Sequence, residues 1–303
     1  MQLKGICSMK KAIFDFLLNW GLSRSDSTLK NRILGFISEQ RPLVAAMLFP
    51  AVLACATLAL GKFPDLEDVA VMLVVVYLAV ACMHVLNDVI DADRDKMKWP
   101  LRPLPTGLVS RMEAAVYALA MGTISLILAF YYFNWQFPLV ILLTLVLGSI
   151  YTAYTRDKIG YLTLIFIPAL APIGVWVAFS AQTVFSWIPW LLFLFVALHQ
   201  IGHIVATEIH LLEARPLLIK PKWENMLYGF SVIAMFIAGT FLYFVAHLHW
   251  IYLAILAACT VLALIAFVPF ARDPKSINNV KNAQIVMVTG SIFGSVGLLI
   301  GAL

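Results

Sequence analysis

A stretch of nine residues, NDVIDADRD from Asn87 to Asp95, contains four aspartates and directly follows a long apolar run. If that run continues as a helix through the stretch, Asp88, Asp91 and Asp95 have the i, i+3, i+7 spacing that places side chains on one face. Asp93 points elsewhere. Carboxylates on one stripe repel one another and are poorly solvated at a membrane boundary, so we expect a cation to neutralise them.

Carboxylate and amide oxygens are typical ligands of Mg²⁺. This ion is usually held by one or two carboxylates together with water and the phosphates of a substrate. We therefore expect Asp88, Asp91 and Asp95 to be metal ligands, with Asn87 one helical turn from Asp91. The alternative interpretation is a solvated helix end whose acids face water.

Basic residues follow the acids at once, in KMKWPLRPLPTG from Lys96 to Gly107. Its prolines end the helix and stiffen the loop. Arg102 offers a planar fork for phosphate oxygens, and Lys98 offers a point charge. Metal-binding acids followed by phosphate-binding bases predict a site for Mg²⁺ and a diphosphate. An alternative role for the lysines is to anchor this face to anionic lipid.

The composition indicates the environment in which this site must form. Of the residues, 62% are hydrophobic and only 12% are charged, with a mean hydropathy of +0.93, which excludes an ordinary soluble globular chain. Apolar runs of about 20 residues predict nine membrane spans, with eight as the alternative. The predicted spans are residues 43–60, 69–87, 113–133, 137–154, 161–180, 185–207, 226–246, 250–270 and 282–303. We expect an all-α integral membrane protein whose helices surround a central chamber.

The distribution of basic residues predicts the orientation. If the N-terminus is cytoplasmic, 20 of the 21 lysines and arginines fall in cytoplasmic segments and only Lys62 lies outside. The net charge of +5 then belongs to a face beside anionic lipid in the plasma or inner membrane, and nucleic acid is not expected as a partner. The longer polar loops are also on this side, so we expect the chamber and its active site to open to the cytoplasm.

Two sequence motifs resemble those of the UbiA superfamily of intramembrane prenyltransferases. NDVIDADRD followed by RPLPTG is similar to the family's first aspartate-rich motif and its adjoining loop. GSIYTAYTRDKIG, residues 148–160, is similar to its tyrosine-plus-basic segment, and Arg41 and Pro42 match the pair that precedes the first span. The resemblance implies one transmembrane prenyltransferase-like domain over residues 41–303, after a cytoplasmic segment, residues 1–40, with an interfacial helix.

The resemblance also implies an activity and roles for residues of this chain. Mg²⁺ would hold an isoprenyl diphosphate, whose ionisation gives an allylic cation that an aromatic, quinone-precursor or lipid acceptor captures. The residues expected to hold Mg²⁺ and diphosphate are Asn87, Asp88, Asp91 and Asp95. Those expected to contact phosphate are Arg102, Arg156 and Lys158, with Tyr151 lining the site.

The predicted sixth span ends in HQIGHIVATEIHLLEAR, from His199 to Arg215, where the family carries a second acidic motif. Glu208 matches the opening of that motif and is expected to be a metal ligand, but Leu211 and Arg215 occupy the next two acidic positions. We expect Arg215 to pair directly with diphosphate, in place of a metal's charge. Because the chain departs from the family's second acidic motif here, an alternative function stays open, an intramembrane terpene synthase that needs no external acceptor.

Two histidines lie on the same stripe of this span. His199 and His203 have i, i+4 spacing, so they are expected to line the chamber, where a neutral His203 can accept a proton. Hydrogen bonding between helices is the alternative interpretation of that spacing. A different class of function, a transporter or lipid-binding protein, would also place charged residues within the membrane. That function does not explain the spacing of the aspartates.

The predicted orientation can be tested by cysteine labelling of intact cells. A Lys98→Cys variant should react with a membrane-impermeant maleimide only after the cells are permeabilised, because residue 98 is expected on the cytoplasmic side. Lys62→Cys is the matched control and should react in intact cells. Labelling of residue 98 from outside would contradict the orientation.

Overall fold

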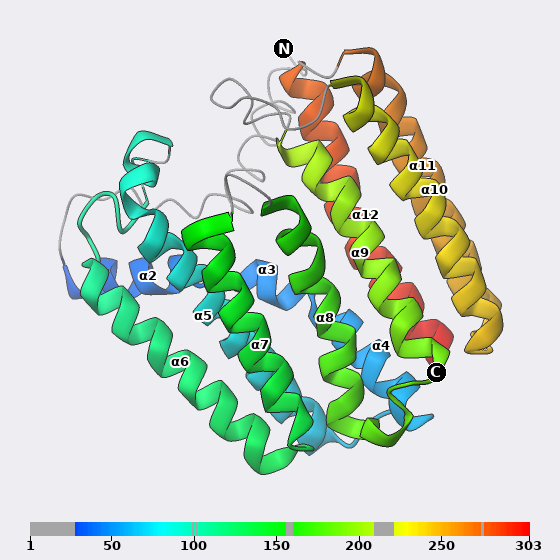
Figure 1. Cartoon of the computed structure of the whole chain (residues 1–303), viewed down its shortest axis with the longest axis horizontal. Helices are drawn as coiled ribbons and strands as arrows, with labels where there is room; N and C mark the ends of the chain where they lie inside the picture. The colour runs from blue at the N-terminus through cyan, green and yellow to red at the C-terminus, as the bar shows by residue number, and fades with distance from the viewer. Residues whose placement is uncertain (1–27, 99, 101, 156–159, 209–220, 274–275) are drawn as a thin grey trace.

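The structure, a computed structural model, describes residues 28–98, 100, 102–155, 160–208, 221–273 and 276–303. Helices dominate these residues (Figure 1). The N-terminal elements are α2 (Leu29–Glu39), α3 (Pro42–Met47) and α4 (Phe49–Leu60). The longer helices are α5 (Leu66–Lys98), α6 (Arg111–Tyr132), α7 (Gln136–Ile150), α8 (Gly160–Ser180), α9 (Trp187–Glu208), α10 (Pro221–Val245), α11 (Trp250–Arg272) and α12 (Ile277–Ala302). Two short helical turns, η1 (Tyr151–Thr155) and η2 (Ala181–Thr183), follow α7 and α8.

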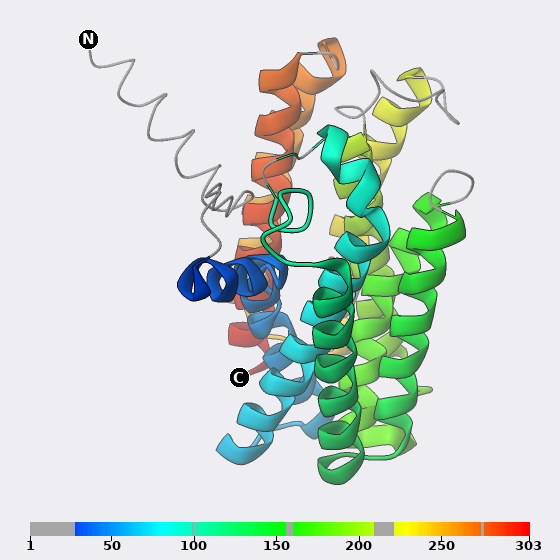
Figure 2. The ribbon, with the colours of Figure 1, turned by 90° about the vertical axis from the view of Figure 1, so that its left-hand side faces the viewer.

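The long helices alternate in direction, so their connections lie at two opposite ends of the bundle (Figures 1 and 2). The connections at residues 61–65, 133–135 and 246–249 lie at one end, and the loop that follows α5 lies at the other. In Figure 1, α5, α6 and α7 form the left-hand part of the bundle and α9 to α12 form the right-hand part. Helix α8 packs against α7 on one side and α9 on the other and so links the two parts, and α4 packs against α8 and α12.

Eight helices in the described residues are long and apolar enough to cross a membrane, which supports an integral membrane protein. The first predicted span, residues 43–60, is not one helix, because the chain breaks at Leu48 into α3 and the 12-residue α4. Pro50 explains the break, since a proline lacks the N–H of an internal helical position and is tolerated only in the first turn. The count of nine spans and the central chamber stay predictions.

Helix α5 confirms that the second span continues through the aspartate-rich stretch. Its 33 residues correspond to about 50 Å, whereas the hydrocarbon core of a bilayer is about 30 Å thick. The excess length lets the last turns of α5, which carry the acids, extend to the membrane boundary.

Helix α6 holds α5 through a face of small residues. Ser125 donates a hydrogen bond to the Val75 carbonyl of α5 at 2.9 Å. Small side chains allow membrane helices to approach closely, and packing then supplies much of their association. The buried small residues of α6 are Ala114, Ala118, Gly122, Ser125 and Ala129.

Close packing at Gly122 gives a test of this arrangement. A Cβ there would lie 2.9 Å from Cys82 Sγ, so Gly122→Val should lower the free energy of unfolding by about 1–3 kcal/mol. Gly290→Val is the matched control, because nothing lies within 4 Å of a Cβ at that position. Thermal unfolding in detergent should show a lower midpoint for the first variant only; equal midpoints would contradict the packing of α6 on α5.

Candidate active site

The predicted acidic stripe is buried on one face of α5. Asp88, Asp91 and Asp95 are 4%, 7% and 6% exposed, whereas the side chain of Asp93 is 72% exposed. Asp93 pairs at the surface with Lys96, at 3.2 Å, and with Arg111, at 2.5 Å. The prediction that Asp93 points away from the other three is therefore confirmed.

Two arginines from different parts of the chain pair with Asp88 and Asp95, and Arg94 of α5 lies 3.5 Å from the remaining acid, Asp91. Arg102 Nη1 lies 2.6 Å from Asp95 Oδ2 and 3.2 Å from Asp88 Oδ1. Arg41 Nη2 lies 2.7 Å from the same Asp88 oxygen. Burying a carboxylate is costly unless it is paired with a cation, so the burial of these acids depends on these guanidinium groups.

A compact turn positions Arg102. The Thr106 N–H donates to the Arg102 carbonyl at 3.0 Å, and Gly107 has the positive φ of 76° that glycine adopts readily. Ser110 then caps α6 through reciprocal hydrogen bonds with Glu113. Helix α2 packs closely against this turn through Gly35. A Cβ at Gly35 would lie 3.2 Å from side-chain atoms of Leu108 and Val109.

The short segment between α2 and α3 positions Arg41. Its φ of 51° is in the left-handed region, which is uncommon and strained for a residue other than glycine, and Pro42 starts α3 immediately afterwards. This change of direction aims Arg41 at α5. Glu39, two residues earlier, reaches the Arg102 loop, where its Oε1 accepts from the Leu104 N–H at 3.4 Å, and it also lies beside Asp88.

Sequence reasoning assigned no role to Glu39 or Arg41. Arg41 was noted only as part of the resemblance, and the signal that marks both residues is a pair of charged side chains just before a proline that opens an apolar run. Burial, together with the neighbouring Asp88 carboxylate, raises the pKa of Glu39 to about 9. At neutral pH Glu39 is therefore protonated and adds no negative charge to the stripe.

The donor set fits Mg²⁺. Asn87 Oδ1 is buried and has no hydrogen-bond partner among the described residues, and it adjoins the carboxylate of Asp88. No group of three or more histidine, cysteine or acidic side chains in the described part of the chain is compact enough to hold a metal alone. A few oxygen ligands supplemented by substrate phosphates are the usual way in which proteins hold Mg²⁺.

The other predicted site residues lie in different places. Tyr151 is buried at the start of η1, a five-residue π-helical turn that packs against α5, so it lies on the same side of the bundle as the acids. Such turns are frequent at functional sites. His199 bonds instead across to α12, with Nε2 2.7 Å from Ser291 Oγ, and its ring stacks on His203. The interhelical interpretation therefore holds for His199, while a catalytic role for His203 stays a prediction.

Several predicted residues cannot be placed. Arg156, Lys158 and Arg215 lie outside the described residues. Lys98 and Glu208 end α5 and α9, and their side chains are also outside the described part of the structure. Their roles in binding phosphate and metal stay predictions.

Comparison with known proteins identifies the family. The model of the UbiA prenyltransferase family matches residues 47–288, which is most of the chain. The chain belongs to the UbiA prenyltransferase family. A curated UbiA relative, the digeranylgeranylglyceryl phosphate synthase of Thermococcus sibiricus, is 29% identical over 140 residues, or 46% of this chain and 50% of the relative. The chain thus spans about half the length of the curated relatives it matches.

Solved structures show the same fold. One described as giving insights into digeranylgeranylglyceryl phosphate synthase in membranes matches with a TM-score of 0.70 and 17% identity, over 89% of this chain and 98% of the other. A UbiA homologue from Archaeoglobus fulgidus bound to DMAPP and Mg²⁺ matches with a TM-score of 0.61 and 18% identity, over 87% and 98% of the two chains. Both likenesses concern the fold.

The raised pKa of Glu39 predicts a pH dependence of stability. Its ordinary value of 4.5 rises to about 9 in the folded protein, so between these values the folded state keeps a proton that the unfolded state loses. This contribution to stability is present below pH 4.5 and is lost as the pH rises towards 9. Glu39→Gln keeps the oxygen that accepts from Leu104 but cannot titrate. Its thermal midpoint should fall less than that of wild type between about pH 6 and about pH 8.5, and parallel curves would contradict the assignment.

Proposed function

We propose that this UbiA family member is a Mg²⁺-dependent intramembrane prenyltransferase, which moves a prenyl group from its diphosphate to an acceptor within the membrane. The observation that carries the proposal is the buried stripe of Asp88, Asp91 and Asp95 beside Arg41 and Arg102, at the end of a span longer than the bilayer core. It combines ligands for a cation with donors for phosphate at the membrane boundary.

The reaction needs a leaving group with stabilised charge. The bond between the first prenyl carbon and diphosphate oxygen breaks, and the electron pair leaves with diphosphate. The acceptor supplies a new electron pair to that carbon and gives up a proton, which the released diphosphate can take up. Arg41 and Arg102 are positioned to stabilise the negative charge of the departing diphosphate, with the guanidinium of Arg102 held in place by its loop. Bound Mg²⁺ supplies further neutralisation of the diphosphate.

The membrane provides the remaining requirements. An apolar prenyl chain is favourably placed among helices rich in leucine, phenylalanine and methionine. A cationic allylic carbon is also protected from water there. The basic residues on the side of the acids support a cytoplasmic active site with the N-terminus inside.

The acceptor is proposed to be a lipid. The name of the Thermococcus sibiricus relative describes the synthesis of a glycerol phosphate with two geranylgeranyl chains. Adding the second chain requires a geranylgeranylglyceryl phosphate as the acceptor. We use this amphiphile as the first acceptor to test, with aromatic and quinone-precursor acceptors as the alternatives.

Matched substitutions test the acidic stripe. Asp91→Asn removes a proposed metal ligand and keeps its size, so the turnover number should fall by about 100-fold or more. Asp93→Asn changes an acid of the same helix that lies off the stripe, so turnover should stay within about twofold of wild type. Purified variants are compared at saturating Mg²⁺ and geranylgeranyl diphosphate. An equal loss in both variants would contradict the stripe as the catalytic element.

Omitting the acceptor separates transfer from cyclisation. Purified protein is incubated with Mg²⁺ and geranyl, farnesyl or geranylgeranyl diphosphate, and the extract is analysed by gas chromatography and mass spectrometry. Diphosphate release should stay slow until an acceptor is added, because the acceptor captures the allylic carbon. Rapid formation of a cyclic terpene without acceptor would establish the synthase instead.

A further inference from the structure

A second polar cluster, formed by Gln40, Tyr77 and Tyr117, lies deeper in the bundle than the acidic stripe and adjoins it through Gln40, the residue before Arg41. Tyr77 Oη lies 2.5 Å from Gln40 Oε1, and Gln40 Nε2 donates to Tyr117 Oη. The three side chains come from the end of α2, from α5 and from α6, and Gln40 is buried. Polar groups inside a membrane protein are costly when unpaired, so a network that joins three helices indicates a specific role.

Counting donors shows that this cluster can bind a ligand. A primary amide has two N–H donors and one carbonyl, and each phenol has one O–H donor. One phenol donates to the Gln40 carbonyl oxygen and the other accepts from its amide nitrogen, whichever way the amide is turned. One phenol proton and one amide proton then remain beyond the two hydrogen bonds that join the cluster. The cluster therefore presents hydrogen-bond donors suited to a hydroxyl, carbonyl or phosphate oxygen.

The position of the cluster connects it to the diphosphate site. Gln40 immediately precedes Arg41, which holds Asp88. Tyr77 lies 11 residues before Asp88 on α5, which is three turns along the same face and about 16 Å nearer the membrane interior. An acceptor whose polar end lies at the cluster would therefore approach the prenyl carbon from the side of the membrane interior, about three helical turns from Asp88.

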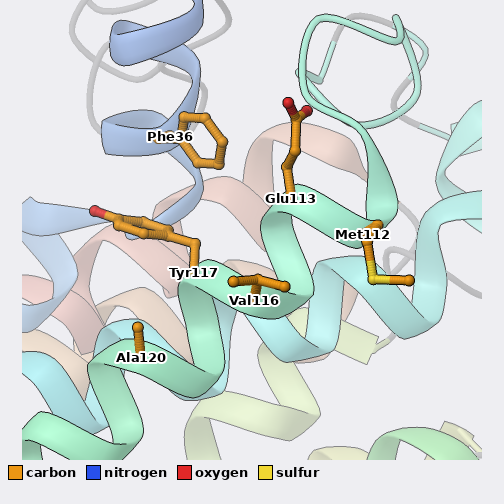
Figure 3. Close-up of a pocket in the computed structure, with 6 residues that line it drawn as sticks. All are labelled: Phe36, Met112, Glu113, Val116, Tyr117 and Ala120. Atoms are coloured by element: carbon orange, nitrogen blue, oxygen red, sulfur yellow. The ribbon is translucent and has the colours of Figure 1, made fainter.

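A slot beside α6, closed on one side by Phe36 of α2, adjoins this cluster at Tyr117 (Figure 3). It has a volume of about 420 Å³ and is lined by Phe36, Met112, Glu113, Val116, Tyr117 and Ala120. Met112 and Val116 are exposed on the first turns of α6, a helix long and apolar enough to span the membrane, so the slot lies at the membrane boundary. Tyr117 forms a wall of the slot with its ring, and Figure 3 shows its hydroxyl pointing away from Met112 towards the α2 side.

The two ends of the slot differ in polarity. At one end Arg32 of α2 pairs with Glu113, and one turn further along α6 the ring of Phe36 packs edge-on against Tyr117, with centroids 5.0 Å apart. Beyond Tyr117 the wall continues at Ala120. An amphiphile with a polar head between the ion pair and the Gln40 cluster, and an apolar chain along α6, matches this order.

We propose that Gln40, Tyr77 and Tyr117 bind the polar end of the prenyl acceptor, an amphiphilic lipid that enters from the bilayer through the slot beside α6. This inference rests on the proposed prenyl transfer and assigns its acceptor site. Tyr117 is the residue that joins the two features, because it both lines the slot and belongs to the cluster.

Two variants separate acceptor binding from diphosphate binding. Tyr117→Phe removes the hydroxyl and keeps the ring, and Ala120→Trp fills the slot. With geranylgeranylglyceryl phosphate as the probe, both should raise the KM for the acceptor, by about fivefold for the lost hydrogen bonding and by more for the filled slot. The dissociation constant for geranylgeranyl diphosphate should change by less than about twofold. Leu119→Trp, on the adjacent exposed surface of α6, is the matched control and should leave both values unchanged.

A binding readout that needs no turnover completes the test. A diazirine analogue of geranylgeranylglyceryl phosphate is cross-linked to wild type and to the two tryptophan variants, and the labelled peptide is found by mass spectrometry. We expect label between residues 29 and 39 or between residues 111 and 121 in wild type and Leu119→Trp, and its loss in Ala120→Trp. Label elsewhere, or an unchanged acceptor KM in both site variants, would overturn the acceptor site. Labelling of the slot without any transfer would instead overturn the proposed function.

Discussion

The burial of three carboxylates on one face of α5 is the constraint on which the site depends. Asp88, Asp91 and Asp95 repel one another, and the low dielectric around them makes that repulsion expensive. Arg41 and Arg102 supply the opposing charge for Asp88 and Asp95, and Arg94 supplies it for Asp91. Protonation of Glu39 avoids a fourth negative charge beside Asp88. In such a site the acids can bind a cation and the arginines can bind an anionic substrate. Each group then exchanges its present ion-pair partner for a new one.

Backbone features remote from the charges maintain this balance. The length of α5 brings the acids to the membrane boundary, and the left-handed Arg41 turns the chain so that consecutive residues face different partners. Glu39 reaches the loop of Arg102 and also lies beside Asp88, Gln40 reaches Tyr77 and Tyr117, and Arg41 pairs with Asp88. One short segment thus connects the diphosphate site, its supporting loop and the proposed acceptor site, which makes coordinated binding of two substrates physically reasonable.

The sequence predicted the parts of this site that depend on local geometry. Helical spacing placed the three acids on one face and Asp93 off it, and the prolines after Lys98 predicted the end of α5. Arg41 is 47 residues from Asp88, and Gln40 is 77 residues from Tyr117, so only tertiary folding brings these pairs together. Periodicity also could not show that Leu48 divides the first predicted span, or that His199 bonds to Ser291 across the bundle.

Binding of a diphosphate that cannot react tests the central claim most directly. The dissociation constant of geranylgeranyl thiolodiphosphate for the purified protein is measured by calorimetry with Mg²⁺ and again with EDTA. If the acidic stripe holds the substrate through a cation, removing Mg²⁺ should weaken binding by about 100-fold, and Asp88→Asn should bind weakly in both conditions. Equal affinity of the wild type with and without Mg²⁺ would contradict the stripe as a magnesium-diphosphate site.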